Sequence, residues 1–85
     1  PSVAGLPVSL TAVGLRGEIE VPVINLWEQP GFGRENHVAA RVSMPAAGHV
    51  DARLVNQIQA AGVTWDEVRV SDVRGWVVSR FVREQ

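Results

Sequence analysis

Apolar and polar residues alternate along several short stretches of the chain, and the alternation has the two-residue period of β-strands. These stretches, which are rich in β-branched and aromatic residues, occupy residues 18–27, 37–42, 63–70 and 76–82. Turn-forming residues separate them, notably at 29–33 and 71–75. The pattern predicts an all-β domain built as a small barrel or sandwich.

The stretch after Gly48 fits two templates. Val50, Leu54 and Ile58 recur every four residues before Gly62, as in a helix with a glycine stop. Val50, Ala52 and Leu54 also alternate as a strand should. The local pattern does not choose between a helix and a strand.

The first 17 residues are small and apolar, with glycine and proline interruptions and no sustained period. They predict an extended lead-in that docks onto a domain formed by residues 18–85. Pro22 cannot donate a ladder hydrogen bond, which predicts a sheet edge or a bulge at that point. With 85 residues, 46% of them hydrophobic and 20% charged, the chain is expected to fold as one small domain.

Each tryptophan is expected on the opposite strand face from a nearby aliphatic residue. The three pairs are Trp27 with Leu26, Trp65 with Val68, and Trp76 with Val77. The indoles would then form an aromatic strip outside the aliphatic core, open to a ligand or partner. Alternatively, apolar side chains of the lead-in seal the strip as a second small core, and the candidates are Val3, Leu6, Val8, Leu10 and Val13.

Composition narrows the function classes. Eight Lys+Arg against nine Asp+Glu give a net charge of -1, which argues against nucleic acid as a partner. The absence of cysteine excludes disulfides, thiolate nucleophiles and thiolate metal sites. No apolar run reaches membrane-spanning length, so direct membrane insertion is not expected.

Candidate catalytic and metal-binding groups are sparse. His37 and His49 have no third ligand at a diagnostic spacing, so we expect no metal site. Asp66 and Glu67 are adjacent in a predicted strand and project to opposite faces, so they cannot form an acid–base pair, and we expect both in solvent. Phe32, between two glycines, is expected at a mobile loop tip. The chain is predicted to be noncatalytic and without a cofactor.

Several motifs, taken in order, resemble the bacterial Src-homology-3-like domain family. They are Val-Ile-Asn-Leu-Trp at 23–27 with Pro-Gly at 30–31, Gly48 before an alternating segment, Gly-Val-Thr-Trp at 62–65, and Gly-Trp-Val-Val at 75–78 with an aromatic at 81. The resemblance implies a five-stranded, strongly bent barrel, a strand at 49–56 and a short helical turn near 79–81. The chain departs from the family pattern at Asp66, where a tyrosine is common, and at Trp27, where a small or basic residue is more usual. Its lead-in has no counterpart in the family.

Domains of this family are noncatalytic modules that attach exported proteins to peptidoglycan or peptides, or that serve as docking modules. The resemblance therefore implies an extracytoplasmic or cell-surface module with an aromatic strip for an extended peptide or cell-wall polymer. The predicted ligand-binding residues are Trp65 and Phe81 as stacking surfaces, Trp27 and Trp76 beside them, and Glu28 and Arg34 as rim charges. The alternative is a structural or assembly domain whose aromatic face docks onto neighbouring domains or subunits of a larger protein.

Overall fold

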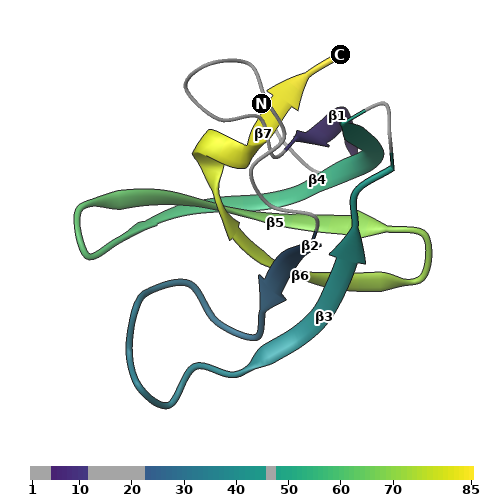
Figure 1. Cartoon of the computed structure of the whole chain (residues 1–85). Helices are drawn as coiled ribbons and strands as arrows, with labels where there is room; N and C mark the ends of the chain where they lie inside the picture. Colours follow the sequence, from purple (N-terminus) through teal and green to yellow (C-terminus); the bar gives the residue numbers. More distant parts are fainter. Residues whose placement is uncertain (1–4, 12–22, 46–47) are drawn as a thin grey trace.

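The computed structural model describes residues 5–11, 23–45 and 48–85, and its strands form one antiparallel sheet (Figure 1). The strands are β1 (Leu6–Thr11), β2 (Val23–Trp27), β3 (Val38–Ser43), β4 (His49–Ala60), β5 (Val63–Val70), β6 (Val73–Val78) and β7 (Val82–Glu84). Their order in the sheet is β3-β2-β6-β5-β4-β1-β7. The all-β prediction is confirmed.

The predicted count of five strands is wrong, because the described residues alone form a sheet of seven. One additional strand, β1, lies within the predicted lead-in. The other arises because the 3-10 turn η1 (Ser79–Phe81) divides the predicted strand at 76–82 into β6 and β7. The helical turn was expected, and the chain after it turns to pair with β1. The sheet is not closed, and β3 and β7 form its two edges.

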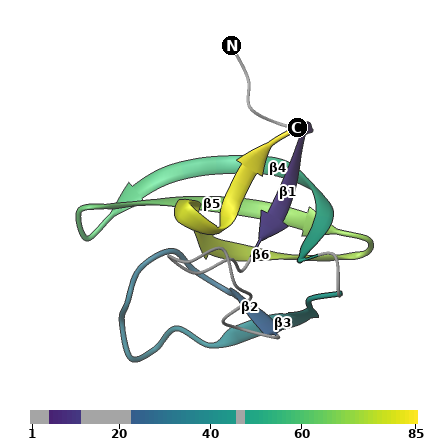
Figure 2. The same ribbon diagram turned by 45° about the horizontal axis from the view of Figure 1, so that its top comes forward.

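Strand β1 is an integral part of the sheet. It pairs with β4 on one side and β7 on the other (Figure 2). Val8 and Leu10 are fully buried and belong to the same core as Leu26. The described part of the lead-in therefore contributes to the main core. The alternative interpretation, in which these side chains cover the tryptophans, is wrong for Val8 and Leu10. Leu6 is partly exposed, and Val3 and Val13 lie outside the described residues.

Residues 49–60 form a strand, which resolves the ambiguity in favour of the alternating template. Ala52 and Leu54 are both buried. The pairing register with β5 then shifts between Leu54 and Asn56, which is a β-bulge. The bulge moves Ile58 to the face of its partner Trp65, where Ile58 is 39% exposed. The four-residue spacing of Val50, Leu54 and Ile58 is therefore not helical, and the bulge places Ile58 on the opposite face from Leu54.

The sheet has two distinct faces, which we call inner and outer. The inner face carries the aliphatic core, with Leu26 and Val68 fully buried and Val77 almost so. The outer face carries Trp65, opposite Val78, and Trp76, opposite Trp27. The predicted separation of indoles from the aliphatic core is confirmed, but the expectation that the indoles form an open strip is wrong for Trp65, which is 2% exposed. Pro22, which was expected at a sheet edge or a bulge, lies outside the described residues.

Gly75 allows β2 to cross closely over β6. A Cβ atom at this position would lie 2.6 Å from the Cβ of Leu26 and 3.1 Å from the carbonyl oxygen of Trp27. Any larger residue would force the strands apart. The glycine of the Gly-Trp-Val segment is therefore a packing requirement that sets Leu26 into the core and Trp27 beside Trp76.

Candidate functional site

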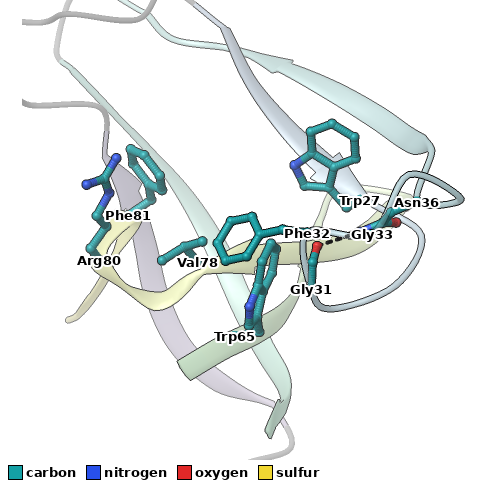
Figure 3. Close-up of a pocket in the computed structure, with 9 residues that line it drawn as sticks. All are labelled: Trp27, Gly31, Phe32, Gly33, Asn36, Trp65, Val78, Arg80 and Phe81. Carbon is teal, nitrogen blue, oxygen red and sulfur yellow. Dashed lines mark hydrogen bonds between the residues drawn. The ribbon is translucent and has the colours of Figure 1, made fainter. Parts of the chain in front are cut away.

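A cleft of about 320 Å³ opens on the outer face, and we call it the aromatic cleft (Figure 3). It is built by the end of β2, the loop between β2 and β3, the start of β5, the end of β6, and η1. Its lining residues are Trp27, Gly31, Phe32, Gly33, Asn36, Trp65, Val78, Arg80 and Phe81. Most of the wall is therefore ring or aliphatic surface.

Trp65 forms the deepest described part of this wall. Its side chain is only 2% exposed, although it lies on the opposite face of β5 from the aliphatic core. The Phe32 ring meets it edge to face, with 5.1 Å between ring centroids and 62° between planes. Among the residues that the structure describes, the buried indole N–H of Trp65 has no hydrogen-bond acceptor. A buried indole N–H normally has a hydrogen-bond partner, so Trp65 contributes an unsatisfied buried donor to the cleft wall.

The loop that carries Phe32 is held at its base by Asn36. The Asn36 side-chain oxygen accepts from the backbone N–H of Gln29, and its amide donates to the carbonyls of Gln29 and Gly31. Gly31 has φ 114°, a conformation that favours glycine. These bonds fix where the loop leaves and rejoins the sheet, while Phe32 itself is 67% exposed. The Phe32 contact was missed at the sequence level, where its two glycines indicated only a loop tip.

One end of the cleft is formed by η1. The Arg80 guanidinium carbon lies 4.8 Å from the centroid of the Phe81 ring, within the range of a cation–π contact. Of the described residues that line the aromatic cleft, Arg80 is the only one with an ionisable side chain. The cleft is thus apolar with one positive charge at its η1 end.

The structure brings together three of the predicted binding residues and separates the other three. Trp27, Trp65 and Phe81 line the aromatic cleft, although they come from different parts of the chain. Trp76 is half-buried on the same face, opposite Glu67, but does not line the cleft. Glu28 and Arg34 are exposed in the β2–β3 loop and are not among the lining residues.

A second, smaller cleft of about 200 Å³ adjoins the first. It shares Trp27, Val78 and Phe81 with the aromatic cleft and continues along β2 past Val23 and Asn25. The two clefts together make an elongated apolar surface. Such a surface suits an extended chain better than a compact small molecule.

The expectation that Asp66 is solvated is wrong. Asp66 lies opposite Val77 on the inner face and is 2% exposed. Gln57 Nε2 donates to Asp66 Oδ1 at 2.8 Å. Burial raises the pKa of Asp66, and the hydrogen bond from Gln57 opposes that rise. Glu67 is on the other face, as predicted, with its carboxylate 3.4 Å from Arg74.

The described parts of the chain hold no cluster of three or more His, Cys, Asp or Glu residues arranged to bind a metal ion. His37 and His49 are both exposed. Within the same residues, no helix has the length and apolar character needed to cross a membrane.

Comparisons with protein-family models, with curated proteins and with solved structures found no match for this chain. The resemblance to bacterial Src-homology-3-like domains and the cell-surface location thus stay predictions from the residues. Any functional assignment has to start from the aromatic cleft.

Proposed function

We propose that this chain is a noncatalytic binding module that holds an extended peptide in the aromatic cleft. The observation that carries this proposal is the indole N–H of Trp65, a residue of the cleft wall: this N–H is buried and has no partner among the described residues. A buried donor without an acceptor costs about 1–3 kcal/mol, and a ligand carbonyl would recover that free energy. Peptide carbonyls recur along an extended chain, so one can be placed at the indole while side chains lie on the rings.

The lining favours a peptide over a hydroxyl-rich polymer. The Asn36 side chain already makes three hydrogen bonds within its own loop. Besides the Trp65 indole N–H, the polar lining side chains include the indole N–H of Trp27 and the guanidinium of Arg80. A polysaccharide would lose many water contacts on this surface and regain few. A cell-wall polymer is therefore the less favoured of the two ligands.

The ligand reaches Trp65 by moving Phe32. The Phe32 ring packs against Trp65 but is largely exposed, so the free energy lost on displacing it is small. The glycines on both sides of Phe32 permit backbone conformations that other residues resist. An apolar ligand side chain would then take the place of the Phe32 ring over the indole.

We also propose that the sheet is a variant of the Src-homology-3-like architecture. Support comes from the consecutive order β7-β1-β4-β5-β6 and from η1 placed just before the last strand. In this interpretation β1 is the first barrel strand, and the β2–β3 hairpin is an elaborated loop between the first and second strands. This alignment places the first strand in the lead-in, where the sequence resemblance placed none.

The test begins with selection of short linear peptides on the immobilised domain, followed by calorimetry with the enriched peptides. Trp65→Phe keeps a ring but removes the N–H, and we expect it to weaken binding about tenfold, which corresponds to about 1.4 kcal/mol. Phe81→Ala removes a wall of the cleft and is expected to weaken binding at least as much. Trp76→Phe is the matched control, because Trp76 is on the same face but outside the cleft.

The outcome that contradicts the proposal is equal peptide affinity in Trp65→Phe, Phe81→Ala and the folded wild type. If peptides fail to enrich and isolated peptidoglycan is retained through the same residues, the ligand is the polymer. If neither binds and Phe81→Ala abolishes self-association measured by sedimentation, the domain has an assembly role. Circular dichroism on each variant separates lost binding from lost folding.

A further inference from the structure

Three arginines stand side by side on the outer face, away from the aromatic cleft. Arg53 on β4 pairs directly with Arg69 on β5, and Arg69 pairs directly with Arg74 on β6. Directly opposed residues in antiparallel strands share a face, with Cβ atoms about 4.5–5.5 Å apart. All three residues are exposed. We call this set the arginine row.

The arginine row is costly for the folded chain. Like charges placed directly opposite each other across strands are destabilising. Arg53 Nη1 donates to the carbonyl of Gly5, which holds the side chain but cancels no charge. Arg74 lies 3.4 Å from Glu67, but the Arg74 side chain is 62% exposed, so solvent weakens this ion pair. Within the described residues, no hydrogen bond or ion pair involves the Arg69 side chain.

A shallow polar cleft of about 190 Å³ lies at one side of the row. It is lined by Asp51, Ala52, Arg53, Arg69 and Ser71, and it shares no residue with the aromatic cleft. Ser71, in the β5–β6 turn, contributes to the lining of this cleft together with Arg53 and Arg69. Asp51 is the opposing charge in this cleft, and its carboxylate already accepts a hydrogen bond from Gln85 Nε2 at 2.8 Å.

We propose that the arginine row is a binding site for a phosphate-type oxyanion carried by a ligand. Guanidinium groups present planar forks of N–H donors that match phosphate oxygens. A phosphate monoester dianion presents three terminal oxygens and two negative charges to several forks at once, whereas a carboxylate presents two oxygens and a single charge. Bound phosphate would turn the repulsion within the row into attraction. This site is separate from the peptide cleft and does not depend on it.

The test is chemical unfolding in methyl phosphate against sodium chloride of the same ionic strength, at about pH 7.5, where a phosphate monoester is mostly dianionic. We expect methyl phosphate to stabilise the folded chain and to shift the Nε–Hε NMR signal of Arg69 with a saturable dependence on concentration. Dimethyl phosphate, with one charge, is expected to bind at least fivefold more weakly. Equal binding of the two probes would point to a phosphodiester as the natural ligand group and would keep the site.

Substitution of Arg69, at the centre of the arginine row, tests whether the row binds phosphate or is only an exposed charged surface. In chloride, Arg69→Thr should raise stability by relieving repulsion, and it should remove the response to methyl phosphate. Arg41→Thr is the control, because Arg41 is an exposed strand arginine opposite Asn25. Asp51→Asn should tighten methyl phosphate binding by removing the opposing charge.

The proposal is overturned if methyl phosphate acts equally on wild type and Arg69→Thr, or if the Arg69 signal does not respond to it. Either result would mean that the arginines are only solvated. Because the NMR readout uses the wild-type chain, it decides the question even if a variant fails to fold. A failure here leaves the peptide proposal standing, since that proposal depends on Trp65 and Phe81.

Discussion

The two faces of β5 and β6 differ in how completely their side chains are packed, hydrogen-bonded or paired with an opposite charge. On the inner face, Val68 and Val77 are packed into the core, and the one buried acid, Asp66, is hydrogen-bonded to Gln57. On the outer face, the Trp65 N–H has no acceptor within the described parts of the chain, and Arg69 lies between two arginines. The same two strands therefore carry a fully packed core on one face, and on the other face an unpaired hydrogen-bond donor and a row of like charges.

This difference separates positions that stabilise the fold from positions that are available for binding. Unsatisfied groups reduce stability, so a small domain retains them only where the rest of the structure compensates. Here the compensation is an inner face that includes β1, β2 and β4 as well as β5 and β6. We therefore expect substitutions on the inner face to lower the stability of the fold, and substitutions on the outer face to change binding without a comparable loss of stability.

The largest effect is expected from Leu26→Ala. Leu26 is fully buried, and shortening it leaves a cavity where β2 crosses β6, so we expect a loss of about 3 kcal/mol in the free energy of unfolding. Urea denaturation measures this loss. Leu6→Ala, at a partly exposed strand position, is the control and should cost less than about 1 kcal/mol. Equal losses at the two positions would contradict the assignment of Leu26 to the core.

Gly75→Ala should follow, with a loss of about 2 kcal/mol from the clash with Leu26. Gly62→Ala is the matched control, because Gly62 has φ 77° but nothing within 4 Å of its added Cβ. That substitution should cost about 1 kcal/mol from backbone conformation alone. If Gly75→Ala were the milder of the two in thermal or urea unfolding, the close crossing of β2 over β6 would be wrong.

Phe32→Ala should cost less than about 1 kcal/mol, because the ring is mostly exposed and contributes mainly its edge contact with Trp65. Its clearer effect should be optical. Removing the ring opens Trp65 to solvent, so fluorescence emission should shift to longer wavelength and acrylamide quenching should increase. Unchanged quenching would show that Phe32 does not cover this indole.

The smallest effect, visible mainly as a change with pH, is expected at Asp66. Burial raises its folded-state pKa above 3.8, so the folded state binds the proton more tightly than the unfolded state does. This group's contribution to stability therefore falls as pH rises from 3.8 through the folded pKa, and it is recovered on acidification. Asp66→Asn keeps an acceptor for Gln57 but carries no charge. The free energy of unfolding of this variant, relative to that of the wild type, should therefore increase as the pH rises through that window. A relative stability that does not change with pH would contradict the burial of a titrating carboxyl.

Strand periodicity predicted much of the inner face. The alternation around Leu26, Val68 and Val77 placed these residues in the core and the indoles opposite them, because a pleated strand has a fixed period of two. The same rule failed at Ile58, where a bulge shifts the register. It also could not show that Val8 and Leu10 belong to the core, because glycine and proline around β1 obscured its short alternation.

Less of the candidate site could be predicted. Trp65, Phe81 and Trp27 were identified as ring surfaces, but their convergence depends on how the sheet bends, which no local pattern specifies. Phe32 was missed because a loop residue has no periodicity to place it against a partner. Asp66 was assigned to solvent because charged residues are rarely buried. Its hydrogen-bond donor Gln57 lies nine residues earlier, on the neighbouring strand and beyond the β-bulge, so the alternation of either strand alone does not pair the two residues.

The central claim is tested most directly by the three indole N–H signals in NMR spectra during titration with a selected peptide. We expect the Trp65 N–H signal to move downfield to a saturating value as it donates to a ligand carbonyl, while the Trp76 signal changes little. A Trp65 signal that stays fixed while the peptide binds would contradict the account, because the unpaired donor would then have no part in recognition.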